Sequence, residues 1–383
     1  MNEQRYSVAV IGGGAAGLCA TIAYLKKNPG GKIVLLEKMD ECGKKLLATG
    51  NGRCNISNTA VPEYEEIKDF FLEIGIPFRV DEEGRAYPRS NRALSVRDAL
   101  VSACEKLGAV VETKSAVSSL TPNDDGFVLD CTLGEPKKIF VEKVLIATGG
   151  KAGPSYGSTG DGYYFSTKLG HEVKQPIPAL VPLEYDCTTT DKLGKLKGVR
   201  AKTTAELFVG GESIASSSGE VQFNSDAISG IMIFDLSRKI PRPSEGQNHI
   251  SLNNEVIIKV DLAPDMSEEE LKSLLESEIN IGLRGVLDER LAEYIEKEAK
   301  GDVDEMIRLV KGLEAKIFVS KGWKESQITG GGIALSEIDS NTGESLICKN
   351  LFFAGEILDE DFDCGGFNLS FAWTSGMRAG NNL

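Results

Sequence analysis

"VAVIGGGAAGLCATIAYL", from Val8 to Leu25, contains no charged side chain, and its pattern decides the fold. A run of about 18 apolar residues is long enough to span a membrane. A spanning helix, however, would lose about 1 kcal/mol at each glycine of the central cluster relative to alanine. Glu3 and Arg5 precede the run and no small-residue cleavage site follows it, which disfavours a secretory signal. We therefore expect a phosphate-binding turn in a soluble protein.

The glycines of this stretch have the spacing of a dinucleotide-binding turn. Gly12, Gly14 and Gly17 form GxGxxG between a β-branched run and an alanine-rich, helix-forming run. The first glycine permits the sharp bend, the second lets a diphosphate approach the backbone, and the third lets the helix pack closely on the strand. Glu37 ends the next strand-like run, where its carboxylate can accept hydrogen bonds from a ribose. A glycine-rich turn that only packs is the alternative, and the turn alone does not separate FAD from NAD.

Two later strand-like runs favour FAD. "VLIATGG" (Val144–Gly150) and "LFFAGEILD" (Leu351–Asp359) end in small residues, the second in Gly355 and Glu356. In flavoproteins with one split nucleotide domain, such a late strand reaches the ribityl and diphosphate part of FAD. Each run could instead be a core strand with a tight turn. No second GxGxxG follows a strand, and no helix-forming stretch is expected directly after the glycines of residues 147–160. We therefore expect no separate NADPH domain, so that any NAD(P)H would dock transiently beside the flavin as an electron donor.

Composition and charge restrict the partners. The chain has 383 residues, more than one hydrophobic core usually holds, and a formal net charge of −14. That charge disfavours a nucleic-acid backbone as partner, and the basic cluster at residues 192–202 is more typical of a solvated loop. Eight cysteines without a CxxC pair and only two histidines predict no metal site and reduced thiols in the cytoplasm. We expect a small-molecule substrate, no nucleic acid and no membrane partner, while the oligomeric state is left open.

The pattern along the chain predicts an α/β fold with an insert. Strand and helix alternate in the first half, including a helix with Ser95 as its N-cap. From about Asp186 strand-like pieces surround turn residues, and three charged helical patterns follow between residues 268 and 314. After Gln327 the strand-and-glycine pattern returns, so the two ends of the chain are expected to share one domain.

The stretch "GKKLLATGNGRCNISN" (Gly43–Asn58) points to a family. It resembles the signature of the aminoacetone oxidase family of three-domain bacterial FAD-binding flavoproteins, the BaiN/YhiN-like NAD(P)/FAD-dependent oxidoreductases. Further matches cover nearly the whole chain: "GRAYPRSNRALSVRDAL" (Gly84–Leu100), "YGSTGDGYYFSTKLGHEV" (Tyr156–Val173), "PALVPLE" (Pro178–Glu184), "SGIMIFDLSR" (Ser229–Arg238), "GGIALSEID" (Gly331–Asp339) and "AGEILDEDFDCGGFNLSFAWTSG" (Ala354–Gly376).

The resemblance implies three domains. The first is a discontinuous Rossmann-like, glutathione-reductase-like FAD-binding domain at residues 1–186 and 327–383. A β-barrel-like insert on the substrate side takes residues 187–265 and 315–326, and a small helical domain takes residues 266–314.

The catalytic residues are not assigned by the sequence, but four candidates stand out. Arg53 and Asn55 offer a guanidinium and an amide on a glycine-rich loop, suited to the flavin edge or its phosphates. Arg53 could instead satisfy loop carbonyls. Cys364 and Phe367 stand where family members often carry Thr and Tyr, which puts any role of those hydroxyls in doubt; Cys364 is more often a small hydrophobe than a reactive group. His171 is expected to cap or pack rather than to catalyse.

A helix that starts at Gly366 would place backbone N–H groups beside the flavin pyrimidine ring and stabilise the charge of the reduced ring. The residues expected to bind FAD are Gly12, Gly14, Ala15, Ala16, Gly17, Glu37, Lys38, Lys45, Asn51, Gly52, Arg53, Cys54, Val117, Thr148, Gly149, Gly150, Gly355, Glu356, Gly366, Phe367, Asn368 and Leu369.

The sequence therefore predicts an FAD-dependent oxidoreductase that acts on a small organic substrate by hydride transfer at flavin N5. The first hypothesis is an amine oxidase of the aminoacetone type that uses O₂. The alternative is an NAD(P)H-dependent reductase of an activated C=C bond in a steroid or similar enone. A flavin-dependent RNA modifier or a non-catalytic flavin-binding protein is the hypothesis from another class.

Overall fold

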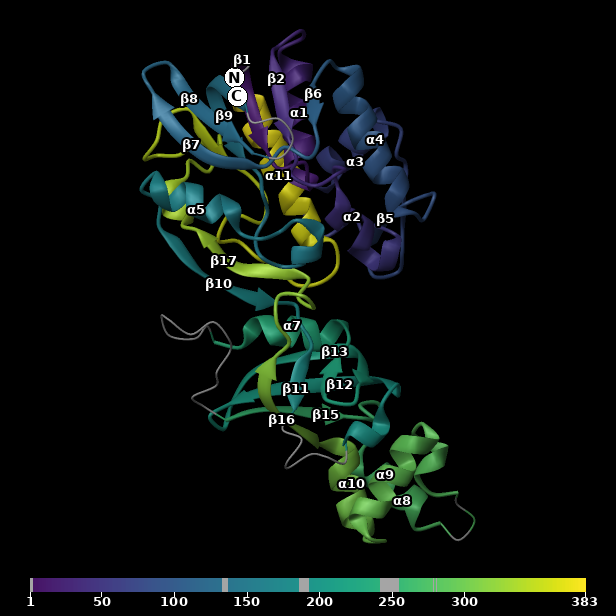
Figure 1. The fold of residues 1–383 in the computed structure, drawn as a ribbon. Coiled ribbons are helices and arrows are strands. Elements are labelled where there is room, and N and C mark those ends of the chain that lie inside the picture. Colours follow the sequence, from purple (N-terminus) through teal and green to yellow (C-terminus); the bar gives the residue numbers. More distant parts are fainter. Residues whose placement is uncertain (1–2, 133–136, 186–192, 242–254, 278, 280) are drawn as a thin grey trace. The chain divides into compact units, whose positions relative to one another are not determined.

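The computed structural model describes residues 3–132, 137–185, 193–241, 255–277, 279 and 281–383. The chain divides into two compact units (Figure 1), one of Met1–Pro176 and Ile328–Leu383 and one of Ile177–Gln327. The first unit contains both ends of the chain. In the part of the chain that the structure describes, no helix is both long and apolar enough to cross a membrane.

The first unit is built on a sheet whose five parallel strands have the order β6-β2-β1-β9-β18. These strands are β1 (Glu3–Ile11), β2 (Ile33–Leu36), β6 (Val110–Glu112), β9 (Lys137–Ile146) and β18 (Leu351–Phe353). Strand β9 also pairs antiparallel with β8 (Gly126–Cys131), and β8 pairs with β7 (Val117–Asn123). The α/β fold with a β-meander is therefore as predicted, and β18 brings the late part of the chain beside the early part.

The parallel strands are apolar because both faces of the sheet are covered. Val8 and Val10 of β1 belong to one core cluster, and Ala9 and Ile11 belong to another. All four side chains are at most 5% exposed. The first cluster contains residues of the helices on one face, and the second contains residues of the meander and of α5 (Asp161–Lys168).

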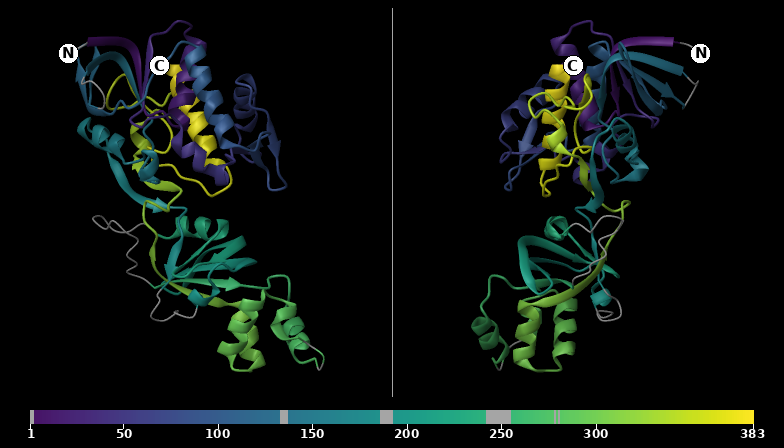
Figure 2. Two further views of the ribbon diagram at one scale, coloured as in Figure 1. Left: turned by 45° about the vertical axis from the view of Figure 1, so that its right-hand side comes forward. Right: turned by 90° about the vertical axis from the view of Figure 1, so that its left-hand side faces the viewer.

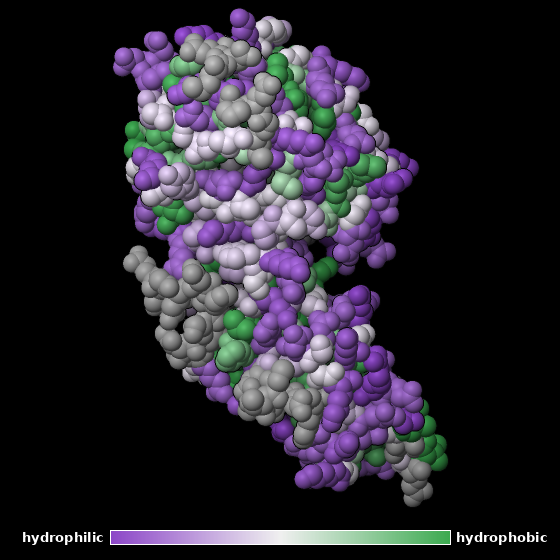
Figure 3. All heavy atoms as spheres, in the orientation of Figure 1, coloured by the Kyte–Doolittle hydropathy of each residue, from purple (hydrophilic) through white to green (hydrophobic). Residues whose placement is uncertain are grey.

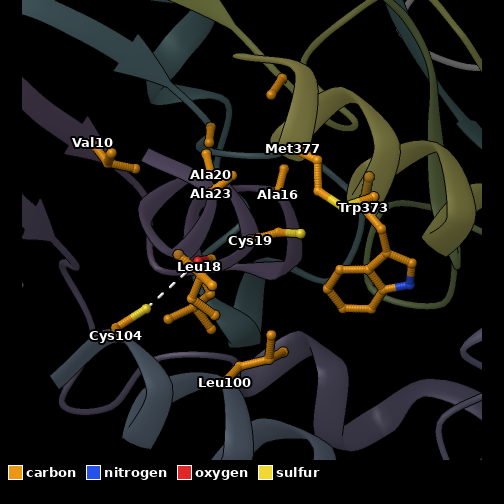
Figure 4. Close-up of a cluster of buried hydrophobic side chains, with 14 of the residues drawn as sticks. Val10, Ala16, Leu18, Cys19, Ala20, Ala23, Leu100, Cys104, Trp373 and Met377 are labelled. Atoms are coloured by element: carbon orange, nitrogen blue, oxygen red, sulfur yellow. Dashed lines mark hydrogen bonds between the residues drawn. The ribbon is translucent and has the colours of Figure 1, made fainter. Parts of the chain in front are cut away.

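Three helices pack together on the first face, α1 (Ala15–Lys27), α4 (Ala93–Lys106) and α11 (Phe367–Asn382), as Figures 2 and 4 show. Trp373 of α11 is fully buried in this cluster. A Cβ atom on Gly376 would lie 2.5 Å from the carbonyl oxygen of Ala16, and one on Gly380 would lie 2.2 Å from that of Ala20. The two glycines thus let the backbones of α11 and α1 touch, and the rising residue numbers on both helices show that they run parallel.

Two predictions about helix starts are wrong. Helix α4 begins at Ala93 with Arg92 as N-cap, and Ser95 lies inside it. The apolar stripe explains this, because Ala93 is buried together with Val96 and Leu100 and so already belongs to the packed face. Helix α5 opens directly after Gly160, where no helix was expected, because that glycine is left-handed and ends the glycine-rich loop.

Smaller elements complete the first unit. A three-stranded sheet of β3 (Ser57–Asn58), β5 (Arg85–Pro88) and β4 (Phe78–Val80) lies with α2 (Lys44–Ala48) and α3 (Tyr64–Glu73) in the segment between β2 and α4. Strands β10 (Val173–Ala179) and β17 (Ile328–Ile333) form a two-stranded sheet where the chain leaves the unit and returns to it.

The second unit is a closed barrel with helices. The barrel order is β11-β14-β13-β12-β15-β16, formed by β11 (Leu183–Tyr185), β12 (Arg200–Val209), β13 (Glu212–Phe223), β14 (Ala227–Ser229), β15 (Val256–Asp261) and β16 (Leu313–Ser320). Val256, Ile258 and Val260 of β15 are buried at every second position, as expected for strands with one face inward. Helix α7 is Ile231–Lys239, and α8 (Glu268–Leu275), α9 (Glu289–Ala299) and α10 (Val303–Lys311) follow β15.

The helices α8–α10 have a mostly hydrophilic visible face in Figure 3. Their first turns carry acidic residues, and Ser267, Asp288 and Asp302 cap them by accepting backbone hydrogen bonds. The three-part domain assignment at the boundaries given above stays a prediction.

Candidate functional site

The turn between β1 and α1 requires two of its glycines for its own geometry. Gly12 has a φ of 107°, and a Cβ there would lie 2.5 Å from the carbonyl oxygen of Ala147. A Cβ on Gly17 would lie 2.0 Å from the carbonyl oxygen of Gly12. Gly14 differs, because a Cβ there would meet no atom within 4 Å. Gly12 and Gly17 therefore form the turn, whereas Gly14 borders open space that a ligand can occupy.

The N-terminus of α1 has the features of an anion-binding site. Gly14 is its N-cap, no side chain accepts a hydrogen bond from its first turn, and no acidic residue lies there. The free N–H groups and the helix dipole therefore favour a negative ligand such as a diphosphate. Glu37 lies beside the turn, where Oε2 accepts a hydrogen bond from the Gly13 N–H and Oε1 accepts one from the Met39 N–H, both at 2.8 Å. Each oxygen keeps a lone pair for a ribose hydroxyl.

The loop of the family signature is a run of left-handed residues. Gly50, Asn51 and Gly52 all have positive φ, and so does the buried Cys54. The Arg53 side chain lies over the ring of Tyr87 with its Cζ 5.0 Å from the centroid, and its Nε donates to the Gly50 carbonyl at 3.1 Å. The alternative that Arg53 satisfies a loop carbonyl is therefore observed, but its terminal nitrogens have no partner among the described residues and can still donate to a ligand.

Asn55 follows this loop and lies at the start of α11. Its Oδ1 is buried and has no hydrogen-bond partner among the described residues. Gly366 is the N-cap of α11 with a φ of 103°, and a Cβ there would lie 2.9 Å from Asn55 Oδ1 and 2.5 Å from the Ser57 carbonyl oxygen. No side chain caps α11 and its first turn carries no acidic residue, so its free N–H groups face the same corner as Asn55.

The side chain of Asn368 fixes the segment that precedes α11. Its Oδ1 accepts from the Phe362 N–H at 2.9 Å, and its Nδ2 donates to the carbonyl oxygens of Phe362 and Asp363. Cys364 and Phe367 are both half-buried beside this segment. The amide nitrogen of Asn368 is therefore used within the chain, whereas its backbone N–H in the first turn of α11 remains a donor for a ligand.

A polar network joins three distant segments near the end of β18. Lys45 Nζ contacts Glu356 Oε2 at 2.7 Å, and Glu356 Oε1 accepts from the N–H and hydroxyl of Thr329 at 3.0 and 2.9 Å. Thr329 Oγ1 in turn accepts from the N–H of Lys151 at 2.8 Å. A Cβ on Gly150 would lie 2.2 Å from Thr329 Oγ1, so only glycine fits at position 150 beside the threonine. Glu356 is thus a positioning residue that holds Lys45 and β17.

Sequence reasoning missed Thr329 and Ser375. Ser375 accepts a hydrogen bond from the Gly355 N–H at 2.9 Å and so fixes the turn after β18. The local signal for Thr329 is its place in the glycine-rich "ITGGG" run of β17. Gly13 was also missed, although its N–H donates to Glu37 and a Cβ there would lie 2.6 Å from Cys42 Sγ.

Two buried thiols near the site, Cys42 and Cys54, are protonated at neutral pH. Burial raises the pKa of Cys42 to about 12, and the neighbouring Glu37 carboxylate adds to the effect. Burial likewise raises the pKa of Cys54 to about 12. Neither thiol is therefore suited to act as a thiolate nucleophile, and the role of Cys54 in cofactor binding stays a prediction.

The structure brings the predicted cofactor residues other than Val117 into three groups, of which the first and the third are in contact through Gly12 and Thr148. The groups are Gly12, Gly14, Ala15, Ala16, Gly17, Glu37 and Lys38 at the turn; Asn51, Gly52, Arg53, Cys54, Gly366, Phe367, Asn368 and Leu369 around the start of α11; and Lys45, Thr148, Gly149, Gly150, Gly355 and Glu356 at the network. Lys38 contacts Asp161 at 2.6 Å, so its charge is partly neutralised. Val117 begins β7, two residues after Ser115, whose N–H donates to the Glu37 carbonyl.

The contacts between the parallel helices α1 and α11 show how far apart their two uncapped N-termini lie along the α11 axis. Gly376 lies at the level of Ala16, and α11 begins nine residues earlier, at Phe367. At about 1.5 Å per residue, the start of α11 therefore lies about 13 Å beyond the start of α1 along the α11 axis. A ribityl chain with its attached ring can bridge this distance from a diphosphate. The open Gly14 position, the two uncapped helix starts and the orphaned Asn55 oxygen fit an FAD molecule.

Comparison with known proteins also points to a flavin-dependent family. The model of the family described as "HI0933-like protein Rossmann domain" matches residues 6–66 and 63–382. The "3-dehydro-bile acid delta(4,6)-reductase" of Clostridium scindens is 30% identical, over 97% of this chain and 98% of that protein. The "Ribosomal RNA dihydrouridine synthase" of Escherichia coli is 25% identical, over 99% of this chain and 98% of that protein.

Solved structures show the same fold. A 3-ketosteroid-delta4-(5alpha)-dehydrogenase from Rhodococcus jostii aligns with a TM-score of 0.53 and 14% identity, over 99% of this chain and 96% of that one. A flavocytochrome c3 fumarate reductase in an open conformation gives a TM-score of 0.53 with 16% identity, over 99% of this chain and 78% of that one. The resemblance drawn from the "GKKLLATGNGRCNISN" signature is confirmed: the chain belongs to the HI0933-like family and is an FAD-dependent oxidoreductase with a Rossmann-like cofactor domain.

Proposed function

We propose that the protein reduces a C=C bond conjugated to a carbonyl group in a small organic substrate, with NAD(P)H as the electron donor. The observation that carries this proposal is the 30% identity, across nearly the full length of both chains, to a bile acid Δ4,6-reductase. The second relative, a dihydrouridine synthase, saturates a C=C bond beside a ring carbonyl. The alternative of the sequence analysis, an enone reductase, thus becomes the first choice.

FAD, when bound, would supply the carrier that takes a hydride from NAD(P)H and passes it to the carbon β to the substrate carbonyl, and a proton from water at the α carbon would complete the saturated product. The residues of the chain hold it there. The first-turn N–H groups of α1 bind the diphosphate and Glu37 binds the ribose. The N–H groups of Phe367, Asn368 and Leu369 stabilise the negative charge that a reduced pyrimidine ring carries.

The polar network keeps these parts aligned. Glu356 ties Lys45 of the signature segment to Thr329 of β17, and Gly355 is tied to α11 by Ser375. We assign Arg53 the role of a donor to an anionic oxygen of the cofactor or substrate, because Tyr87 holds its guanidinium while its terminal nitrogens stay available. Cys364 and Phe367 remain candidates for contact with substrate.

Anaerobic flavin reduction tests the proposal. NADPH or NADH should bleach the bound FAD, and a 3-oxo-Δ4 steroid such as 4-androstene-3,17-dione should restore the colour. The matched saturated 3-oxo steroid, which lacks only the C=C bond, should not. A flavin that neither nicotinamide nucleotide reduces under these conditions would refute the reductase.

The amine oxidase hypothesis stays a prediction with its own test. Aminoacetone should then bleach the flavin anaerobically, and air should restore it with consumption of O₂. Bleaching by aminoacetone but not by NAD(P)H would select the oxidase over the reductase. We keep the cytoplasm, which contains NAD(P)H, as the expected compartment.

A second candidate is reduction of uridine in ribosomal RNA. It is favoured by two relatives of that name, at 25% and 28% identity over 99% and 96% of this chain. The prediction of no nucleic-acid partner is therefore untested. The basic cluster begins at Lys192, outside the described residues, and within it Arg200 pairs with Glu220 at 2.9 Å. Incubation with NADPH and deproteinised ribosomal RNA should leave the uridine content unchanged if the substrate is a small enone.

A further inference from the structure

We propose that Asn55 positions the flavin ring by accepting a hydrogen bond from its N3–H group. This inference rests on the proposed FAD site and adds the residue that fixes the pyrimidine edge. Asn55 Oδ1 is buried without a partner among the described residues. Buried side-chain oxygens of folded proteins nearly always have a donor, so this atom points to a donor that the chain itself does not provide.

The surroundings of Asn55 explain why the chain leaves this oxygen free. A Cβ on Gly366 would lie 2.9 Å from Asn55 Oδ1, and a Cβ on Gly50 would lie 2.9 Å from the Asn55 nitrogen. Both positions are glycines with positive φ, so no side chain enters the corner from either segment. The corner is therefore shaped by backbone, with the Asn55 oxygen on one side and the first turn of α11 on the other.

Hydrogen-bond donors and an acceptor lie side by side in this corner. The first-turn N–H groups of α11, from Phe367 to Leu369, are donors without intrahelical acceptors, and Asn55 Oδ1 beside them is an acceptor. A matching ligand edge must present an acceptor next to a donor. The pyrimidine edge of the flavin does so, because its N3–H donor lies between the O2 and O4 acceptors. The pairing assigns O2 to the helix start and N3–H to Asn55.

The distance along α11 indicates that the flavin ring, and not the adenosine, reaches Asn55. The start of α1 takes the diphosphate, and the start of α11 lies about 13 Å further along the helix axis. The adenosine end extends toward Glu37, whose carboxylate lies at the turn and accepts a hydrogen bond from the Gly13 N–H. The group that reaches Asn55 is therefore the ring at the far end of the ribityl chain.

N3-methyl-FAD tests the contact, because the methyl group removes the donor and leaves the rest of the ring unchanged. We expect apo wild-type protein, titrated by flavin fluorescence, to bind N3-methyl-FAD at least about tenfold more weakly than FAD. Asn55→Ala should bind FAD about tenfold more weakly than wild type and discriminate less than about twofold between the two ligands. An Asn55→Ala variant that keeps the wild-type ratio would overturn the proposal.

Two further variants make the test decisive. Asn55→Asp keeps an acceptor and has no amide donor, so it should retain the preference for FAD, while its charge lowers the reduction potential of the bound flavin. Loss of the preference in Asn55→Asp would mean that the amide donates, which contradicts the assignment. Asn58→Ala is the matched control: the Asn58 amide is paired with Gly365 and Ala60, so this variant should lose apo stability and keep the preference.

The outcomes separate this inference from the proposed function. A wild-type protein that binds no FAD would refute both the site and the role of Asn55. A protein that prefers FAD over N3-methyl-FAD through Asn55 but reduces no enone would refute only the proposed reaction. Should Asn55→Ala fail to fold, the wild-type ratio and the Asn55→Asp ratio still decide the assignment.

Discussion

Substitution of Gly14 by alanine should separate cofactor binding from folding. The backbone of Gly14 has φ −84° and ψ −165°, which alanine adopts without strain, and a Cβ there meets no protein atom within 4 Å. Alanine restricts the unfolded chain, which stabilises the fold by about 0.4–1 kcal/mol, but it is a poorer N-cap than glycine by a similar amount. The free energy of unfolding of the apo protein should therefore change by less than about 0.5 kcal/mol.

The effect on FAD should be large. If the diphosphate lies against the start of α1, the new methyl group occupies its path and breaks one or two hydrogen bonds to a charged group, each contributing about 1.5–3 kcal/mol. A loss of about 2–4 kcal/mol weakens FAD binding from about 30-fold to several-hundred-fold. Flavin fluorescence titration measures the affinity, and urea unfolding of the apo protein measures the stability.

Gly17→Ala is the matched contrast within the same turn. Its Cβ would lie 2.0 Å from the Gly12 carbonyl oxygen, so the helix must shift by about 1.4 Å to reach an ordinary contact. The free energy of unfolding of the apo protein should therefore fall by about 1–3 kcal/mol. The reasoning fails if Gly14→Ala binds FAD like wild type, because the open space at Gly14 would then not be the path of the diphosphate. It also fails if Gly14→Ala destabilises the apo protein as much as Gly17→Ala.

Three further predictions follow from the packing and the charges. Gly380→Ala should lower the free energy of unfolding by about 1–3 kcal/mol, because its Cβ would lie 2.2 Å from the Ala20 carbonyl oxygen; an unchanged urea midpoint would contradict the close contact of α1 and α11. Glu356→Gln should lower it by about 1–2 kcal/mol, because Lys45 keeps its charge and loses its carboxylate partner; a Lys45→Met, Glu356→Gln double variant should recover part of the loss. Burial lowers the pKa of His171, so the folded state resists its protonation. The His171 contribution to stability should therefore be present above about pH 6.5 and be lost as the pH falls below that value, and His171→Gln should flatten the dependence measured by urea unfolding.

Local sequence predicted the turn because its determinants are local. The spacing of Gly12, Gly14 and Gly17 after a buried strand depends only on neighbouring residues, and the structure has β1, the turn and α1 there. The parts of the site that no pattern revealed depend on contacts across the chain. Thr329 acquires its role only because Gly150 leaves room for it and Glu356 reaches it.

The same physical reason accounts for the errors. The start of α4 was placed at a good capping residue, but the buried position of Ala93 against the core extends the helix by three residues. Asn55 was singled out by residue type within a glycine-rich loop. Its buried and unpartnered oxygen became visible only when Gly366, more than 300 residues later, was placed beside it.

The close seating of α11 on α1 imposes an order on folding during synthesis. Helix α1 leaves the ribosome early, whereas the helix that covers its alanine side is translated only after the entire barrel and its helices. The barrel strands come from one continuous segment and can close while translation continues, but the nucleotide half keeps an open apolar flank until α11 emerges. A nascent chain stalled before residue 367 should therefore contain a closed barrel and a nucleotide half that is still sensitive to protease.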